Sequence, residues 1–227
     1  MIFNRYMRGM SNGGIATGEA LTNAELQARV PSIFAAEAHE SRSARFTPVP
    51  TIQVLDGLRA EGFEPFYAQQ ARSRIEGKAA FTKHLVRLRH RGLTNGENEA
   101  FEIILVNAND GTSSYQMIPG FFRFVCANGL MAGETFNEVK VRHSGDAVSE
   151  VIEGAYTVLE EAPRVTEAMS RFKGIALEDP ERLALAEAAH MLRFPKAHEA
   201  QPMPAPVQAN ALALPRRRED RATDLWT

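Results

Sequence analysis

The clearest pattern of apolar and polar positions lies between Asp146 and Phe172. Apolar residues recur there in two interleaved sets with a seven-residue spacing (Val148, Ala155, Ala162 and Met169; Val151, Val158, Val165 and Phe172). This spacing predicts one long amphipathic helix. Pro163 removes a main-chain hydrogen bond and crowds the preceding turn, so we expect a kink near Glu160. The apolar stripe keeps its register across the proline, which favours a kink over a break.

Three shorter segments carry helix signals, at residues 22–30, 51–61 and 179–193. Thr22 or Asn23 can cap the first of them. Gly62 follows the second, at a position where a helix end needs a positive φ. Asp179 and Pro180 supply an N-cap and a first-turn proline for the third.

Five segments predict extended structure because aromatic and β-branched residues alternate there with polar ones: Phe63 to Arg72, Ala80 to Arg91, Phe101 to Val106, Ser113 to Met117 and Glu138 to Arg142. Asn109-Asp110-Gly111 predicts a tight hairpin between the third and the fourth. We expect Pro119-Gly120 to end the fourth strand. Between Phe121 and Ala127 we expect a short helix that ends at Asn128-Gly129.

Together these elements predict an α+β fold with a mainly antiparallel sheet of four to six strands between Phe63 and Arg142. The long kinked helix and its neighbour should cover one face, because the apolar stripe needs an apolar surface. We expect a flexible arm at residues 1–20, a single domain at 21–194, a linker rich in Pro and Ala at 195–215 and a basic segment at 216–227. The last segment resembles a helix that has only begun.

Composition excludes several classes of protein. The 227 residues are 44% hydrophobic and 24% charged, which is typical of a globular protein. Cys126 is the only cysteine, so no internal disulfide can form, and no apolar run approaches the ~20 residues that cross a bilayer. We therefore expect a cytoplasmic protein without membrane contact.

Charge is distributed unevenly along the chain, although the formal net charge is only −2. Ten Lys or Arg residues and seven Asp or Glu residues lie between Arg72 and His143, an excess of three positive charges. If Phe81 to Arg91 is extended, its Lys and Arg residues share one face, while Val86 and Leu88 point to the other. With two residues of a nearby strand, they form the candidate nucleic-acid site: Lys83, Arg87, Arg89, Arg91, Lys140 and Arg142.

Two readings of this basic face remain open. It can follow a phosphate backbone, with Phe66, Tyr67 or Tyr115 available to stack on bases. Alternatively, it is a solvated face whose arginines form salt bridges with acidic residues of the adjoining strand, namely Glu97, Glu99 and Glu102.

Other residues with catalytic or metal-binding chemistry favour structural roles. His143, Ser144 and Asp146 are the residue types of a hydrolase triad, but neighbouring side chains on one turn do not converge, and a cap for the long helix fits better. Cys126 has no recognisable base near it in sequence. His84 and His90 lie about 20 Å apart in an extended segment, too far to share a metal ion. Residues 12–18 lack the Lys-Ser or Lys-Thr pair of a phosphate loop. We therefore assign no catalytic residue, no metal and no cofactor.

Five segments in order resemble a family of phage- and plasmid-like proteins, domain of unknown function 932: FTKHLVRLRH, ILVNANDGTSSYQMIPG, FRFVCANGLMAG, VRHSGDAVSEVIEGAYTVLE and RRREDRATDLWT. The resemblance implies an origin in a phage, plasmid or integrated element. It supplies no established activity and no catalytic residues. Family members continue beyond the last segment into a basic helix, so we expect this chain to be a truncated or short member.

Three functional hypotheses follow. The first is a non-enzymatic accessory protein of a mobile element that binds nucleic acid, single- or double-stranded, through the basic strand. The second is a module that binds a host protein and modulates or evades a host system. The third is an enzyme of unrecognised type, which needs a pocket that gathers Cys126, His143 or the region of Asp110. Self-association through the apolar stripe is a further possibility.

Overall fold

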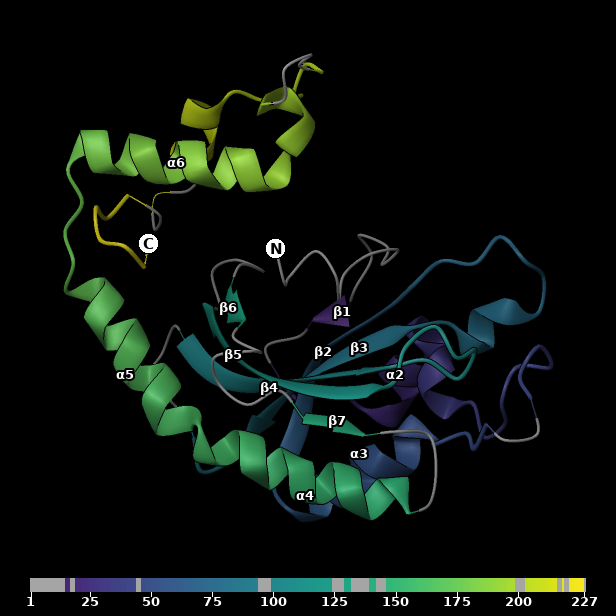
Figure 1. Ribbon diagram of the computed structural model, residues 1–227. Helices are drawn as coiled ribbons and strands as arrows, with labels where there is room; N and C mark the ends of the chain where they lie inside the picture. Colours follow the sequence, from purple (N-terminus) through teal and green to yellow (C-terminus); the bar gives the residue numbers. More distant parts are fainter. Residues whose placement is uncertain are drawn as a thin grey trace. The chain divides into compact units, whose positions relative to one another are not determined.

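The computed structural model describes residues 15–16, 19–43, 46–93, 99–123, 129–131, 139–141, 146–198, 203–215, 218 and 221–226. The chain divides between Thr166 and Glu167 into two compact units, each of which is described by itself. The first unit contains a β-sheet with its helices, and the second contains helix α6 and the C-terminal segment (Figure 1).

The sheet of the first unit is antiparallel in every pairing and has seven strands among the described residues. The strand order is β1-β2-β3-β4-β5-β6, and β7 also pairs with β5. The strands are β1 (Ile15–Ala16), β2 (Phe63–Gln70), β3 (His84–His90), β4 (Glu99–Asn107), β5 (Tyr115–Arg123), β6 (Gly129–Met131) and β7 (Val139–Val141). Six of them fall between Phe63 and Arg142, as predicted.

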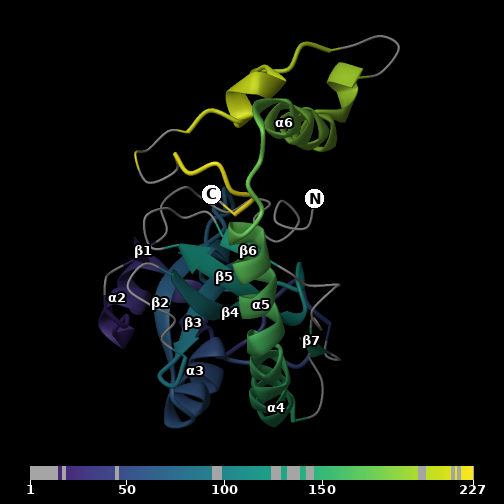
Figure 2. The ribbon, with the colours of Figure 1, turned by 90° about the vertical axis from the view of Figure 1, so that its left-hand side faces the viewer.

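Helices α3 (Thr51–Ala60) and α4 (Ala147–Glu160) lie on the same side of the sheet (Figure 2). Leu55 and Leu58 of α3 and Val158 of α4 are fully buried, as are Leu88 and Ile103 of the sheet. Burial of such a side chain stabilises the fold by about 1.5–3 kcal/mol. The predicted α+β architecture, with helices over one face of an antiparallel sheet, is confirmed.

Two helical glycines allow this close packing. A Cβ atom on Gly154 of α4 would lie 2.5 Å from Met117 Cε and 2.7 Å from Val139 Cγ1, so α4 rests directly on β5 and β7. A Cβ atom on Gly57 of α3 would lie 2.6 Å from Ile152 Cδ1. Both glycines bring helix backbones closer than any larger residue allows.

A buried polar network links α3 to the sheet. The Thr51 hydroxyl accepts hydrogen bonds from Tyr115 Oη at 2.7 Å and Asn107 Nδ2 at 3.0 Å, and it lies 2.8 Å from His84 Nε2. All four residues are at most 1% exposed. Burial raises the pKa of Tyr115 far above its ordinary value, against the hydrogen bonds with Thr51 and Asn107. The suggestion that Tyr115 stacks on bases is therefore wrong.

The predicted helix starts are present in the first unit. Thr22 caps α2 (Asn23–Arg29) through a reciprocal pair of hydrogen bonds with Glu25. Asp146 caps α4, since its Oδ1 accepts a hydrogen bond from Ser149 N at 3.4 Å. Gly62 follows α3 with φ at +92°. The short helix η1 (Pro31–Phe34) follows α2 directly.

Three predictions within the sheet are wrong. Pro119 and Gly120 do not end the fourth predicted strand, because β5 continues to Arg123. Its outer neighbour is β7 along residues 115–117 and β6 along 120–122, so Pro119 falls between them, where its missing N–H costs no outer pairing. Residues 121–123 belong to β5 and Gly129 to β6, so these residues form strands rather than a helix with a glycine end; residues 124–128 lie outside the described residues. Residues 78–81 form the short helix η2 (Lys78–Phe81) rather than the start of an extended segment.

The long predicted helix is interrupted near the expected place. Helix α4 ends at Glu160, Glu161 forms a turn, and α5 (Ala162–Lys173) continues. Pro163 lies in the first turn of α5, where its missing N–H leaves no bond unmade. Val151, Val158 and Val165 are each 0% exposed, so the apolar stripe stays buried across the interruption.

The second unit is built around α6 (Asp179–Arg193). Residues 195–215, predicted as a linker, contain the short helices η3 (Pro195–His198) and η4 (Ala209–Leu212). The Arg182 guanidinium of α6 donates a hydrogen bond to the Ala213 carbonyl at 3.1 Å. The end of the chain pairs with the segment before α6 at Ala176 and Asp224. Helix α6 thus belongs with the C-terminal segment, whereas the sequence placed it in a domain with the sheet. No helix of the described residues is long and apolar enough to cross a membrane.

Candidate functional site

The candidate site lies on the face of the sheet opposite α3 and α4. His84 contacts Thr51 of α3, so the alternate residues Arg87 and Arg89 of β3 point to the other face. Paired residues of an antiparallel sheet share a face. Arg87 pairs with Ile104 of β4, and Lys140 of β7 pairs with Gln116 of β5. The predicted basic residues of β3 and β7 thus share one surface, here called the second face.

Glu102 of β4 holds the two arginines of the second face. Arg87 Nε donates to its Oε2 in a very short contact, and Arg89 Nε donates to its Oε1 at 2.7 Å. The carboxylate is 0% exposed, and the arginine side chains are 11% and 21% exposed. The salt-bridge reading of the basic strand is therefore correct for Glu102. The two arginines and Glu102 together carry one net positive charge, and little of it is exposed to solvent.

The two aromatic residues expected to stack on bases lie beneath these arginines. The Arg89 guanidinium lies 4.1 Å from the ring centroid of Phe66, and the Arg87 guanidinium 5.3 Å from that of Tyr67. Tyr67 Oη donates a hydrogen bond to Gln69 Oε1 at 2.9 Å. Burial raises the pKa of Tyr67, while the nearby Arg87 charge lowers it. Both rings are thus in contact with arginine side chains of the protein itself.

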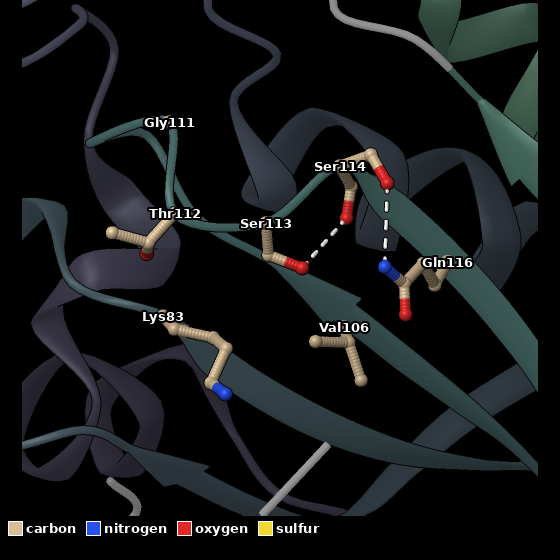
Figure 3. Close-up of a pocket in the computed structure, with 7 residues that line it drawn as sticks. All are labelled: Lys83, Val106, Gly111, Thr112, Ser113, Ser114 and Gln116. Carbon is tan, nitrogen blue, oxygen red and sulfur yellow. Dashed lines mark hydrogen bonds between the residues drawn. The ribbon is translucent and has the colours of Figure 1, made fainter. Parts of the chain in front are cut away.

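A polar pocket of about 300 Å³ opens at the end of the second face, where β4 and β5 are joined (Figure 3). Val106 and Gln116 form its floor on the sheet, and their pairing places them beside each other. Its other lining residues are Lys83, Gly111, Thr112, Ser113 and Ser114. Gly111 has φ at +75°, which a residue with a side chain rarely adopts, and it turns the chain toward β5.

Gln116 has an orphaned oxygen in this pocket wall. Its Nε2 donates a hydrogen bond to Ser114 Oγ at 3.3 Å, as Figure 3 shows. Its Oε1 is buried and has no hydrogen-bond partner among the described residues. A buried polar atom without a partner is uncommon and marks a place where a bound group or water gains a hydrogen bond.

Lys83 gives the pocket its charge. Burial lowers the pKa of the Lys83 ammonium, and the Asp110 carboxylate raises it in opposition. Asp110 is itself engaged: Lys78 Nζ lies 3.2 Å from its Oδ2, and Thr112 N donates to its Oδ1 at 3.0 Å. Burial would raise the pKa of Asp110, but the hydrogen bonds from Thr112 and the charge of Lys78 outweigh it and hold that pKa below its ordinary value. Two lysines and one carboxylate leave the pocket region with a net positive charge.

Comparison with known proteins places the chain in a family. Residues 38–227 match the family described as Domain of unknown function (DUF932). The chain belongs to this family. It is similar to two Escherichia coli K12 proteins, UPF0380 protein YafZ and UPF0380 protein YfjQ, at 50% and 49% identity. Each alignment spans 207 residues, which are 91% of this chain and 73% of the relative. No solved structure matches the chain.

The structure of this DUF932 protein divides the six predicted site residues into groups. Arg87 and Arg89 are brought together by Glu102, and Lys83 lines the polar pocket. Arg91 NH2 lies apart from them and forms a salt bridge with Glu64 at 3.0 Å. Lys140 is exposed on the same face as Gln116. Arg142 lies outside the described residues.

The pocket residues Thr112, Ser113, Ser114 and Gln116 were missed by sequence reasoning in this DUF932 chain. A run of three hydroxyl residues directly after Asn109-Asp110-Gly111 was the available signal, but such runs are common in turns. Only the pairing of β4 with both β3 and β5 shows that this run stands beside Lys83.

The residues weighed for catalysis or metal binding do not assemble into such a site within the described chain. Among those residues, no group of three or more His, Cys, Asp or Glu side chains is placed to hold a metal ion. His84 is enclosed in the buried network, whereas His90 contacts the Glu61 carbonyl. Cys126 and residues 143–145, considered for a hydrolase, lie outside the described residues.

Proposed function

We propose that this protein is a non-enzymatic accessory protein of a phage, plasmid or integrated element that binds single-stranded nucleic acid on the second face. The observation that carries the proposal is the polar pocket beside Lys83, on the same face as Lys140 and the paired arginines. The mobile-element setting rests on the resemblance of the five segments, and the nucleic-acid role rests on the chemistry of this face.

The pocket offers the donors that a phosphate group needs. An ammonium group and three hydroxyl groups line it. The Ser114 hydroxyl accepts a hydrogen bond from Gln116, so its own proton can be donated to a phosphate oxygen, as can those of Lys83. The Thr112 and Ser113 hydroxyls donate to Asp110 Oδ1 and to the Ser114 carbonyl, and they would have to turn away from these acceptors to reach a phosphate. Lysine binds phosphate as a point charge and needs no rigid geometry. The nearby Asp110 carboxylate is held by Lys78 and Thr112, which limits its repulsion of an anion.

A single strand fits this face better than a duplex. The charged groups alternate with apolar residues along a sheet surface, and contact with a flexible backbone needs no groove-filling helix. Lys83 directly precedes β3 and lies four residues before Arg87, so about 13 Å of extended chain separates Lys83 from the paired arginines. Backbone contacts of this kind give affinity without sequence specificity.

The direct test is a salt-dependent binding measurement. A fluorescently labelled single strand and the matching duplex are titrated with the protein by anisotropy between about 50 mM and 200 mM salt, where phosphate-driven binding weakens steeply. We expect Lys83→Ala to weaken binding to all sequences alike and to reduce the salt slope by about 0.7 for one lost phosphate contact. Lys173→Ala, an exposed lysine of α5, is the matched control and should leave both quantities unchanged.

Two outcomes contradict the proposal. A folded wild-type sample that binds neither strand at low salt rejects nucleic-acid binding altogether. Binding that persists in Lys83→Ala with the full salt slope rejects the pocket as a phosphate site. A double substitution of Arg87 and Arg89 by Glu is unsuitable as a test, because it would place two further carboxylates beside the buried Glu102 and unfold the sheet.

Exposed apolar residues on α6 favour a second candidate, a module that binds a host protein. Leu185 is 51% exposed and Leu192 57% exposed, and Leu183 and Met191 are similarly open. Pulldown from nuclease-treated lysate should then retain one partner, and Leu185→Ser with Leu192→Ser should release it. A partner that disappears on nuclease treatment points back to nucleic acid.

A further inference from the structure

Two histidines of the second unit face each other at hydrogen-bond distance. His190 lies in the last turn of α6 and is 6% exposed, and His198 ends the short helix η3 and is exposed. His190 Nδ1 lies 2.8 Å from His198 Nε2. The Phe194 ring packs against His190, with 5.1 Å between the ring centroids. The buried imidazole is therefore held in one orientation.

The other nitrogen of His190 fixes its tautomer. Nε2 lies 2.8 Å from the Val207 carbonyl oxygen, and a carbonyl only accepts hydrogen bonds. Nε2 must therefore carry a proton, which leaves the lone pair of the neutral ring on Nδ1, aimed at His198. An imidazole whose far N–H is anchored on a carbonyl is the arrangement that proteins use to orient a metal-binding histidine.

The pair opens onto a cavity of about 680 Å³. Its lining includes Glu187 and two exposed methionines, Met191 and Met203. Glu187 precedes His190 by one helical turn on α6. Oxygen, sulfur and solvent ligands can thus approach the two imidazoles from the open side.

We propose that His190 Nδ1 and His198 Nε2 bind a transition-metal ion that prefers imidazole nitrogen, such as Zn²⁺ or Cu⁺. Zinc–nitrogen bonds of about 2.0–2.1 Å in tetrahedral geometry separate two ligand atoms by about 3.3 Å. The two nitrogens therefore have to part by roughly half an ångström, which a small rotation of the exposed His198 ring supplies. Solvent or the side chains of the cavity complete the coordination.

Proton balance is simple for this step. In the neutral pair His198 carries its proton on Nε2 and donates it to His190. When the metal takes the place of that hydrogen bond, the proton of His198 moves to Nδ1 of this exposed ring, and no net proton is released.

The two metals differ in the ligands that they recruit. Thioether sulfur selects Cu⁺, whereas Zn²⁺ binds imidazole and carboxylate readily. Met203→Leu should therefore weaken Cu⁺ binding and leave Zn²⁺ binding unchanged if sulfur takes part.

The experiment is calorimetric titration of the tag-free full chain in a Cys126→Ser background, so that the thiol does not compete. Zn²⁺ is added at pH 8, and Cu⁺ is tested anaerobically by chelator competition. We expect one saturable site. His198→Gln should abolish it, and because His198 is exposed this variant keeps its fold; His190→Gln should abolish it as well.

His39→Gln is the matched control, since this histidine of the first unit bonds to Ser41 and pairs with no second imidazole among the described residues. It should leave the site unchanged. Equal affinity in the wild type and in both pair variants overturns the proposal, as does the absence of saturable binding to the wild type. The result is independent of the nucleic-acid proposal, which concerns the first unit.

Discussion

The replacement Glu102→Gln tests how the second face is built, because it should lower stability and raise nucleic-acid affinity together. Glu102 is 0% exposed and accepts hydrogen bonds from both Arg87 and Arg89. Glutamine has nearly the same shape but no charge. Its carbonyl oxygen can accept from one arginine, and its NH2 group then faces the donors of the other.

The magnitude of the stability loss follows from these contacts. One of two charge-assisted hydrogen bonds, each about 1.5–3 kcal/mol, is lost outright, and the other is weakened. Two guanidinium groups are then left without a counter-charge on Glu102. Loss of one partner of a buried pair costs about 3–5 kcal/mol, and the partial exposure of the arginines reduces this figure. We expect a loss of about 2–4 kcal/mol in the free energy of unfolding.

Urea unfolding monitored by circular dichroism measures the first quantity, and the anisotropy titration measures the second. The folded variant has one more positive charge on the second face, so its affinity for a single strand should rise and its salt dependence should steepen. Glu153→Gln, an exposed residue of α4, is the control and should change the free energy of unfolding by about 0.5 kcal/mol or less. Unchanged stability in Glu102→Gln would refute the reasoning about the pair, and weaker binding by the folded variant would refute the role of the second face.

Two further predictions concern the core and the pocket. Val158→Asp places an unpaired carboxylate at a fully buried site between α4 and the sheet, so it should lower the free energy of unfolding by at least about 4 kcal/mol and unfold the first unit. The control Thr157→Asp, on the exposed side of α4, should lower it by about 1 kcal/mol or less. Equal urea midpoints for the two variants would contradict this prediction. Asp110→Asn removes a carboxylate whose pKa is depressed in the folded state, and a depressed pKa stabilises the fold above the unfolded value near 3.8. The wild type should therefore be more stable than Asp110→Asn at neutral pH, and the difference in the free energy of unfolding should vanish as the pH falls through the pKa of Asp110 in the folded state. A constant difference across pH 2–7 would show that the ionised carboxylate does not contribute to stability.

The contacts of the basic strand β3 were only partly predictable from the sequence. Alternation along β3 correctly placed Arg87 and Arg89 on one face, because strand geometry has a period of two residues. Of three acidic candidates on the adjoining strand, Glu102 is the one whose pairing the described structure shows. Which carboxylate meets which arginine depends on the register of β3 with β4, and register is a property of two segments distant in sequence.

The same distinction explains the errors in β5. Pro and Gly are common in turns, and the residues around Pro119 and Gly120 carry no local signal that the strand continues through them. The continuation depends on two different outer partners, β7 and β6, which meet β5 on either side of Pro119. Tertiary pairing overrides local propensity at this point.

By itself the sequence determined the elements whose signals are local and periodic: the kinked amphipathic helix, the helix starts near Thr22 and near Asp146, the hairpin at Gly111 and the α+β class. These follow from spacing and capping, which act over a few residues. Only the tertiary structure decided that Lys83 stands beside the hydroxyl run after Gly111, that Arg87 and Arg89 are held by a buried carboxylate, and that His190 faces His198. Each of these contacts joins segments that are separated in the sequence and depends on how those segments pair or pack. Such contacts leave no periodic pattern in the sequence.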